Sequence, residues 1–456
     1  MAHKASIPKG TRDFLPAEVT KRNYVIDVIR TQFERYGFLP IQTPAMEKSS
    51  TLKGKYGDEG DRLMFNILNS GEKVKKADLN ALEDGALGQF TSSISEKALR
   101  YDLTVPFARF VVQHQNEINF PFKRYQIQSV WRADRPQRGR FQEFMQCDAD
   151  VVGVVSPFLE AECMQLFDDV FDAFSLKGAT IRINHRAILA GIANYIDAPD
   201  RIVAFTVALD KLDKIGLEGV FNELRHNGFD DAVLKRLSPL FDLTGDIMSQ
   251  LNQLEEILVS QPDALEGIAH LRQTLGFLSS FKVSQLSFDL TLARGLHYYT
   301  GIIFEVAPPE SVAIGSIGAG GRYDDLTAVF GLKDVHGLGI SFGLDRLCIV
   351  LEELNLLPTS LKQPVDVVVL HFGDAYMHDL VPFLTKWRKM GIRINCYPTA
   401  HKLKKQMQFA NQIQAPWVMF YGNDEQQKGV VSLKNMGEGT NSEIKLEDFS
   451  KKCINN

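Results

Sequence analysis

The sequence predicts an α+β protein of two or three domains, and three observations lead to that prediction. A chain of 456 residues is too long to fold around one hydrophobic core. Two runs, 124–131 and 140–152, alternate polar and apolar residues in places and flank a polar connection, which is typical of two antiparallel strands joined by a long loop. Beyond residue 363, apolar runs alternate with helical segments, as in a small α/β domain with a mostly parallel sheet.

The composition is that of an ordinary globular protein, with 45% hydrophobic and 23% charged residues. We find no signal peptide and no apolar stretch long enough to cross a bilayer, so a cytoplasmic location is expected. The five cysteines form no CxxC pair and the ten histidines no HExxH motif. This pattern favours reduced thiols and argues against a protein-bound zinc or other metal site.

Charge is distributed unevenly along the chain. The formal net charge is −5, whereas residues 364–456 hold 12 Lys and Arg against 9 Asp and Glu, a balance of +3. Contacts to phosphate depend on local basic patches and not on net charge. The acidic total therefore argues against a basic coat over the whole protein, but it leaves room for RNA binding through limited surfaces.

The first hundred residues predict a helix, a short strand and a surface insertion. Apolar residues recur at helical spacing over 23–36, and Gly37 follows in the manner of a C-cap. A strand is expected at 38–43. Residues 69–97 are polar and contain Gly and Ser, which predicts a surface insertion with a helical piece at 75–82.

Asp102 and Thr104 lie on either side of Leu103 in the segment LRYDLTVPFARF. In an extended segment, two residues separated by one point to the same face. Such a face would offer a carboxylate and a hydroxyl to a ligand. The alternative interpretation is a carboxylate that caps a helix or a turn.

The loop between the two predicted strands is strongly basic. From residue 123 to residue 140 there is one acid, Asp134, and the basic residues are Lys123, Arg124, Arg132, Arg135, Arg138 and Arg140. A solvated basic hairpin is the simpler interpretation of an arbitrary cluster. A polyanion site is favoured here because the cluster is interleaved with residues that suit a base and a polar ligand, namely Phe141, Phe144, Gln146 and Asp150.

Residues 199–283 are dominated by helical periodicity with acids and bases mixed, and they contain no catalytic motif. We interpret them as a helical insertion domain. The stretch LARGLHYYTGIIFEV then returns to strand character, with Arg294, Tyr298 and Tyr299 near its beginning. A pair of aromatic residues in such a place is otherwise ordinary core.

Two further stretches complete this part of the chain. The glycine-rich run 315–323 is neither GxGxxG nor a P-loop, and the chain has no GxxxxGK[ST] anywhere, which argues against a Rossmann site and a P-loop ATPase. Glycines there let a strand approach a ligand closely. Residues 337–346 pass from a strand into a helix whose first turn carries Asp345 and Arg346.

Four of these stretches together resemble the histidyl-tRNA synthetases, a family of class II aminoacyl-tRNA synthetases. WRADRPQRGRFQEFMQCDAD resembles motif 2 of the class, GFLPIQTPAME motif 1 and GLGISFGLDR motif 3. LARGLHYYTG resembles the histidine-specific signature, with His297 where Asp is usual. The resemblance covers nearly the whole chain, and its weak parts are the insertion after Asn69 and the helical insertion domain.

The resemblance implies an architecture. Residues 1–198 and 284–356 would form the class II catalytic core around an antiparallel sheet, and 199–283 a helical insertion that lies over the acceptor arm of the tRNA. Residues 357–363 would be a linker, and 364–456 a C-terminal α/β anticodon-binding domain. Motif 1 lies at a dimer interface in this family, so a homodimer is expected.

The resemblance also implies a reaction with histidine, ATP and tRNA(His). Histidine and ATP would give histidyl-adenylate and pyrophosphate, after which histidine passes to the 3′ end of the tRNA. Arg132 would hold the α-phosphate, and Arg140 and Arg346 the outer phosphates or the adenine face. Phe144 would stack on adenine, and Asp134 would orient the base or a magnesium ion that is bound mainly through the phosphates of ATP.

The remaining roles concern histidine itself. By resemblance, Asp102 and Thr104 would bind the ammonium group, and Gln146 would reach the substrate backbone. Asp150 and Tyr299 suit the two ring nitrogens, with Tyr298 beside them. Arg294 would be a second catalytic arginine, which supplies positive charge to the α-phosphate opposite Arg132.

Three other functions were weighed. A non-catalytic regulatory subunit of an ATP phosphoribosyltransferase would lack the tail domain and would usually lose catalytic arginines, whereas this chain keeps Arg132, Arg294 and Arg346. A class II synthetase for threonine or proline is argued against by the LARGLHYY stretch. A pure RNA-binding module would not need an acidic amino-acid site beside the arginines.

Overall fold

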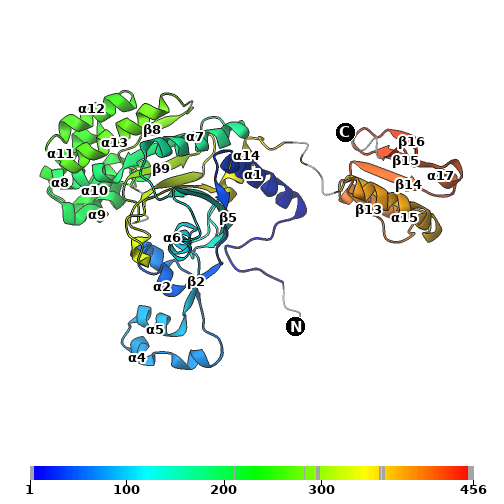
Figure 1. Cartoon of the computed structure of the whole chain (residues 1–456), viewed down its shortest axis with the longest axis horizontal. Helices are drawn as coiled ribbons and strands as arrows, with labels where there is room; N and C mark the ends of the chain where they lie inside the picture. Colours follow the sequence, from blue (N-terminus) through cyan, green and yellow to red (C-terminus); the bar gives the residue numbers. More distant parts are fainter. Residues whose placement is uncertain are drawn as a thin grey trace. The chain divides into compact units, whose positions relative to one another are not determined.

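The computed structural model describes residues 5–449 apart from 210, 282, 294–297, 359–360 and 362–364, and the side chains of 58, 59, 213 and 214 lie outside that description. The chain divides into two compact units (Figure 1). The first contains Met1–Asp13 and Val25–Leu356, and the second contains Phe14–Tyr24 and Leu357–Asn456. The finer boundaries predicted from the sequence stay predictions.

The first unit is built on an eight-stranded sheet in the order β1-β5-β6-β11-β10-β9-β7-β8. In that order the strands are Leu39–Pro40, Phe122–Trp131, Glu143–Val152, Gly337–Gly343, Gly318–Tyr323, Ile302–Ala307, Thr180–His185 and Leu286–Phe288. The edge pairs β1·β5 and β7·β8 are parallel, and the other pairs are antiparallel. The predicted α+β fold with an antiparallel catalytic sheet is confirmed.

Strands β5 and β6 are the predicted hairpin, paired from Phe122 opposite Val152 to Trp131 opposite Glu143. Successive side chains of a strand point to opposite faces of the sheet. The sheet therefore shows two distinct faces along β6. Cys147, Ala149 and Val151 are buried on one face, and Phe144, Gln146, Asp148 and Asp150 belong to the other.

Helices cover the first of these faces. Phe342 of β11 contacts Phe33 of α1 (Pro16–Arg35) and Phe167 of α7 (Pro157–Ala173), with ring centroids 6.0 and 4.8 Å apart. Gly318 of β10 lies under the Phe167 ring, where a β-carbon would stand 2.7 Å from Phe167 Cε1. Helix α1 begins at Pro16, seven residues before the predicted start, because a proline is well tolerated in the first turn.

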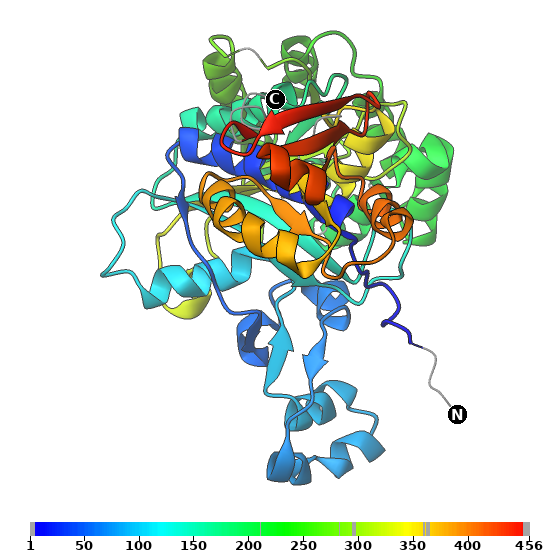
Figure 2. The same ribbon diagram turned by 90° about the vertical axis from the view of Figure 1, so that its right-hand side faces the viewer.

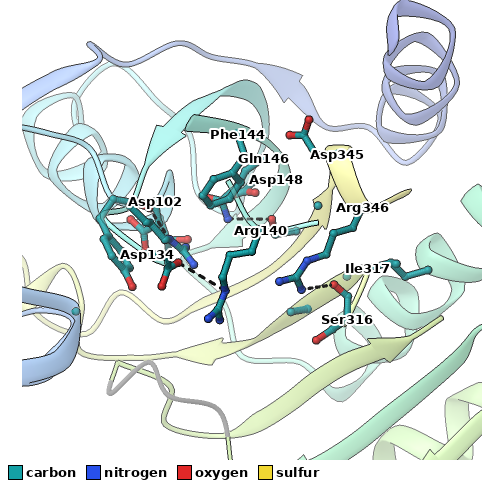
Figure 3. Close-up of a pocket in the computed structure, with 18 of the residues that line it drawn as sticks. Asp102, Asp134, Arg140, Phe144, Gln146, Asp148, Ser316, Ile317, Asp345 and Arg346 are labelled. Carbon is teal, nitrogen blue, oxygen red and sulfur yellow. Dashed lines mark hydrogen bonds and ion pairs between the residues drawn. The ribbon is translucent and has the colours of Figure 1, made fainter. Parts of the chain in front are cut away.

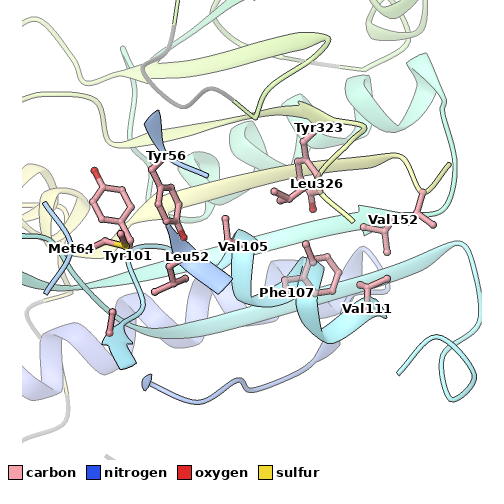
Figure 4. Close-up of a cluster of buried hydrophobic side chains, with 13 residues drawn as sticks. Leu52, Tyr56, Met64, Tyr101, Val105, Phe107, Val111, Val152, Tyr323 and Leu326 are labelled. Carbon is pink, nitrogen blue, oxygen red and sulfur yellow. The ribbon is translucent and has the colours of Figure 1, made fainter. Parts of the chain in front are cut away.

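The opposite face is partly covered by a second hydrophobic cluster (Figure 4). Helix α6 (Thr104–Gln113) contributes Val105, Phe107 and Val111 to it. Tyr56 and Tyr101 join from neighbouring segments, with ring centroids 4.6 Å apart. This cluster holds α6 and the preceding turn at the edge of the uncovered part of the sheet.

A lobe formed by the insertion 69–97 projects from the rest of the first unit on strands β3 and β4 (Figures 1 and 2). Strands β2 (Met46–Lys48), β4 (Lys97–Leu99) and β3 (Asn66–Ile67) form a small antiparallel sheet at its base. The predicted helix at 75–82 is wrong in its bounds. A 3-10 helix η1 ends at Lys76, and Asp78 caps a separate helix α4 (Leu79–Glu83), after which α5 (Leu87–Ile94) follows.

The segment 199–283 is helical, as predicted, and belongs to the first unit. Its helices are η2 (Pro199–Arg201), α9 (Ile202–Leu209), α10 (Leu212–His226), α11 (Asp231–Leu237), η3 (Ser238–Phe241), α12 (Ile247–Ile257) and α13 (Pro262–Leu278). Helix α13 packs on α8 (Arg186–Tyr195) and α7. The η4 turn (Ala328–Phe330) and α14 (Leu344–Glu353) complete the unit, together with α2 (Ser49–Leu52) and α3 (Gly57–Arg62).

The second unit contains a five-stranded sheet in the order β13-β12-β14-β15-β16. The first three strands, Ile394–Cys396, Val367–His371 and Trp417–Tyr421, are parallel as predicted. The antiparallel strands β15 (Val430–Asn435) and β16 (Asn441–Lys445) were not predicted. Its helices are α15 (Asp374–Lys389), α16 (Leu403–Gln412) and α17 (Asn423–Lys428). None of the helices in the described parts of the chain is long and apolar enough to cross a membrane.

Candidate active site

A cavity of about 450 Å³ opens on the face of the large sheet that α1 and α7 leave uncovered. Its walls come from the β5–β6 loop, from β6, β10 and β11, from the beginning of α14 and from the turn before α6. Figure 3 shows carboxylates and arginines converging on this space from strand β6, the β5–β6 loop, the first turn of α14 and the turn before α6. Asp102 lies at one end of it and Arg346 at the other (Figure 3), and further carboxylates, those of Asp134, Glu305 and Asp345, line it near the arginines.

Asp102 marks the acidic end, where its side chain is 1% exposed. Oδ1 accepts hydrogen bonds from Tyr56 Oη at 2.9 Å and from the Val105 amide at 3.1 Å, and Oδ2 accepts one from Tyr298 Oη at 3.1 Å. Burial raises the pKa of Asp102, and these donors oppose the shift. Of the two interpretations of this segment, the structure shows the capping carboxylate, because α6 begins at Thr104 and the Asp102 carboxylate binds the Val105 amide of its first turn.

Tyr298 and Tyr299 stand beside Asp102 with ring centroids 4.8 Å apart. Burial raises the pKa of Tyr298 and of Tyr56 well above the usual tyrosine value. Both hydroxyls therefore stay protonated and act as donors to Asp102 at neutral pH. The acidic end thus has a fixed carboxylate and aromatic walls.

Strand β6 contributes Phe144, Gln146 and Asp148 to the cavity. Asp148 is 2% exposed, and its Oδ1 atom has no hydrogen-bond partner among the residues that the structure describes. Gln146 Nε2 donates to Ser341 Oγ at 3.2 Å, while Gln146 Oε1 is buried and likewise without a partner in the described parts of the chain. Burial raises the pKa of Asp148, with Arg124 opposing the shift. Unsatisfied buried acceptors of this kind suit a ligand with N–H donors.

Asp150 lies two residues further along β6 but is not among the residues that line the cavity. Its carboxylate accepts a hydrogen bond from Tyr323 Oη at 2.6 Å and pairs with Arg124 Nη2 at 2.7 Å. Arg124 is fully buried. Arg124 and Lys123, which pairs with Glu162, therefore do not belong to the cavity, contrary to the basic cluster predicted from the sequence.

Three arginines form the basic end of the cavity. The Arg132 guanidinium lies over the Tyr101 ring, 4.3 Å from its centroid, and 5.2 Å from that of Phe144. Its Nε donates to the Tyr101 carbonyl at 3.1 Å. Arg140 is half-exposed, and its Nε lies 3.8 Å from Asp134 Oδ2. Exposed donors on both side chains remain available to an anion.

Arg346 is held more firmly than Arg140. Its Nε donates to the Gly139 carbonyl at 2.9 Å, and its Nη1 donates to the Ser316 carbonyl at 2.8 Å (Figure 3). Burial, followed by the positive charges of Arg140 and Arg132, lowers the pKa of Arg346. Three cations this close repel one another, so an anion placed between them would be bound favourably.

All but two of the predicted site residues line the cavity: Asp102, Thr104, Arg132, Asp134, Arg140, Phe144, Gln146, Tyr298, Tyr299 and Arg346. The exceptions are Asp150 and Arg294, and the latter lies outside the described residues, as does His297. Sequence reasoning assigned no role to Tyr56, Asp148 or Glu305, which also line the cavity. The period of β6 places Asp148 on the same face as Gln146. Glu305 lies in the stretch LARGLHYYTGIIFEV, where no role was assigned to it, and Tyr56 belongs to no motif that we identified.

No group of three or more His, Cys, Asp or Glu side chains that would hold a metal ion occurs among the described residues. Carboxylates that line the cavity near the basic end are those of Asp134, which pairs with Arg140, of Glu305 and of Asp345. Oxygen ligands of this kind fit Mg²⁺, which commonly keeps water and substrate phosphates as its other ligands.

Comparisons with known proteins identify the same family. The family model described as Histidyl-tRNA synthetase matches residues 89–347, and the model described as Anticodon binding domain matches residues 366–456. A histidine–tRNA ligase of Christiangramia forsetii is 52% identical over 452 residues, which is 99% of both chains. One of Flavobacterium johnsoniae is 50% identical over the full length of both. The crystal structure of histidyl-tRNA synthetase from Nostoc sp. PCC 7120 is 29% identical and superposes over both complete chains with a TM-score of 0.82.

Proposed function

The chain belongs to the histidyl-tRNA synthetase family, and from this premise we propose that it is a histidine–tRNA ligase that activates histidine with ATP and transfers it to tRNA(His). The observation that carries the proposal is one cavity with a buried carboxylate at one end and three arginines at the other. An amino acid and a nucleoside triphosphate are the two ligands that such opposite ends would bind. In the activation step, the histidine carboxylate and the α-phosphate of ATP react where the two ends of the cavity meet.

At the acidic end, Asp102 binds the ammonium group of histidine, with Thr104 beside it. Tyr56 and Tyr298 hold the carboxylate in place through their hydroxyls. Gln146 offers its amide oxygen to the substrate. The carboxylate is positioned before histidine arrives, which reduces the ordering needed on binding.

The imidazole ring requires an acceptor for its N–H. Asp150 and Tyr299 are the pair predicted from the sequence. Asp148 competes with Asp150 for this role, because the Asp148 carboxylate lines the cavity, whereas that of Asp150 is occupied by Arg124 and Tyr323. We assign the ring contact to Asp148 and Tyr299, and give Asp150 the role of linking β6 to the side chains of Arg124 and Tyr323.

At the basic end, Arg132 binds the α-phosphate, and Arg140 and Arg346 bind the outer phosphates or the adenine face. Phe144 stacks on adenine. Attack of the histidine carboxylate on the α-phosphate brings two anions together, so fixed guanidinium groups lower the barrier more than an acid or base would. Mg²⁺ would be held mainly by the ATP phosphates, with Asp134 and Glu305 as the nearest protein carboxylates, and would neutralise the pyrophosphate that leaves.

Arg294 is proposed as the second catalytic arginine at the α-phosphate. This assignment rests on the LARG signature alone, since residues 294–297 lie outside the described part of the chain. The tRNA would be bound by the second unit through its anticodon. A homodimer and a cytoplasmic location are proposed on the same family resemblance.

The experiment that tests this function is ATP–pyrophosphate exchange with each of the twenty amino acids. Histidine alone is expected to support exchange, because a site that hydrogen-bonds a substrate N–H rejects analogues without it by factors on the order of 10⁴. Exchange that is strong with threonine or proline would refute the assignment. Exchange with none of the amino acids would favour a non-catalytic relative.

A further inference from the structure

The segment 5–13 runs beside the outer end of strand β6, next to the basic end of the cavity. The Gln142 amide donates to the Gly10 carbonyl at 2.8 Å, and the Arg132 amide donates to the Gln142 carbonyl at 2.9 Å. Gly10 has a φ of +86°, and a β-carbon there would lie 2.6 Å from Gln142 Cγ. Glycine therefore lets this arm approach the hairpin closely enough to hydrogen-bond with it.

Two residues further on, the Arg12 side chain contacts two residues of the cavity wall without lining the cavity itself. Its Nη2 pairs with Asp345 Oδ1, at the beginning of α14. Its guanidinium lies over the Phe141 ring, 3.3 Å from the centroid. Phe141 and Asp345 both line the cavity, whereas Arg12 is not among the lining residues.

The Asp345 carboxylate connects three segments. Oδ1 faces Arg12, and Oδ2 accepts a hydrogen bond from the Met145 amide of β6 at 3.1 Å. Asp345 is 4% exposed, so its negative charge is stabilised by these partners and not by water. The arm, strand β6 and the first turn of α14 are therefore held at one carboxylate.

Arg346 follows Asp345 directly in the first turn of α14, and the two side chains point in different directions (Figure 3). Arg346 reaches the cavity and donates to the Gly139 and Ser316 carbonyls. A shift of the first turn of α14 would displace the Arg346 guanidinium from any phosphate in the cavity. A tilt of the Phe141 ring would change the wall at the same end.

We propose that Arg12 is a positioning residue for ATP: it fixes the Phe141 ring and, through Asp345, the Arg346 guanidinium. The inference rests on the proposed function, in which the basic end of the cavity binds ATP. Arg12 would thus act on ATP binding without touching either histidine or ATP. Arg12 acts on the ATP end because its ion pair with Asp345 and its contact with the Phe141 ring are there.

The test is histidine-dependent pyrophosphate exchange by the full chain with Arg12→Ala, Arg12→Lys and a matched control, Arg30→Ala. Arg30 pairs with Asp27 at 2.6 Å, but both side chains are exposed, at 44% and 64%. For Arg12→Ala, kcat/KM for ATP is expected to fall by about 10- to 100-fold, since small displacements of positioned groups cost rates of that order. The histidine KM should stay within about twofold of the parental value, because the acidic end is unchanged.

Arg12→Lys keeps the charge but cannot lay a planar group on the Phe141 ring, so an intermediate loss is expected. Arg30→Ala should behave like the parent. Asp345→Asn tests the ion pair of Arg12 separately from its contact with the Phe141 ring, because the substitution weakens the ion pair but leaves the ring contact. The double variant Arg12→Ala/Asp345→Asn should lose much less than the product of the two single losses, since both substitutions remove the same pair.

Two results would overturn the inference. One is an unchanged ATP KM and kcat in Arg12→Ala. The other is a loss shared equally by ATP and histidine with a lowered melting temperature, which would make Arg12 a residue of general stability. If the parent itself shows no exchange with histidine, the proposed function fails and not the role of Arg12. If Arg12→Ala does not fold, Arg12→Lys carries the same comparison of the two KM values.

Discussion

The two ends of the cavity differ in charge and in how far the protein encloses their side chains. At the acidic end, Asp102 is buried and its hydrogen bonds to Tyr56 and Tyr298 are already formed. At the basic end, the Arg140 side chain is 46% exposed and lies 3.8 Å from its nearest carboxylate, Asp134. The acidic end already holds its carboxylate in place, whereas the basic end combines one fixed arginine, Arg346, with the exposed Arg140.

The difference follows from the proposed ligands. A small amino acid offers few groups, so selecting it requires fixed partners in an enclosed site. A nucleoside triphosphate carries several negative charges, and part of it must leave the site as pyrophosphate. An exposed arginine favours that release. A buried guanidinium cluster without an anion would be costly for the free enzyme. Substitutions at the two ends should therefore separate histidine affinity from ATP affinity.

The largest effect is expected for Asp102→Asn. The amide keeps the shape but loses the charge that pairs with an ammonium group, so kcat/KM for histidine should fall by about 10³, the order expected for removing one partner of an enclosed charge pair. Pyrophosphate exchange at varied histidine measures this. The exposed Asp27→Asn on α1 is the control. A histidine kcat/KM close to the parental value would remove Asp102 from the ammonium site.

At the other end, Arg346→Gln should lower kcat/KM for ATP by about 10², the scale of a lost fixed contact to developing charge. Arg138 is the control, since it belongs to the β5–β6 loop that borders the cavity but pairs with Glu353 and does not line the cavity. Arg138→Gln should change either KM by less than about threefold. Equal losses in the two arginine variants would mean that net charge, and not position, controls ATP binding.

The comparison of Asp148→Asn with Asp150→Asn asks which acid serves the imidazole ring. Asp148→Asn should raise the histidine KM by about 10- to 50-fold with the fold intact, the range for one lost hydrogen bond to a charged group. Asp150→Asn leaves the buried Arg124 without its ion pair and should mainly lower the melting temperature. The opposite pattern would return the ring contact to Asp150. Exchange kinetics and thermal melts of both variants decide it.

The smallest effect concerns stability and pH. Burial raises the pKa of Asp148 above the ordinary aspartate value, so the folded state holds its proton more tightly than the unfolded state. The stability associated with that proton is complete below the ordinary value and is lost as pH rises through the raised one. Asp148→Asn should therefore increase the free energy of unfolding by about 1–2 kcal/mol at pH 8 and by little at pH 4. Urea unfolding at both pH values measures the difference, and an equal gain at the two values would contradict it.

The sequence predicted the face of β6 but not the partners of its side chains. Alternation places Phe144, Gln146, Asp148 and Asp150 together because the period of a strand is two. Whether Asp150 reaches the cavity depends on the neighbouring strand β11. The Asp150 carboxylate lies directly against Gly339 of that strand, where a β-carbon would stand 2.1 Å from Asp150 Oδ1. The Tyr323 hydroxyl that binds Asp150 lies 173 residues away along the chain. Contacts at such separation leave no local pattern.

Local rules also failed where a cap or a tertiary pair competed with them. The sequence left an extended segment and a helix cap as alternatives for Asp102, and its carboxylate binds the Val105 amide at the beginning of α6. Arg124 was counted with the loop arginines, yet it is fully buried beside Asp150. Arg132, Arg140 and Arg346, which motifs 2 and 3 singled out, all line one cavity.

The central claim is that the acidic end of the cavity binds histidine and the basic end binds ATP. Its most direct test is a crystal structure with ATP and histidinol, an analogue that lacks the carboxylate and cannot be activated. We expect the histidinol ammonium within hydrogen-bonding distance of Asp102, its ring at Asp148 and Tyr299, and the phosphates among Arg132, Arg140 and Arg346. A structure with the adenine against Asp102, or with histidinol outside this cavity, would contradict it.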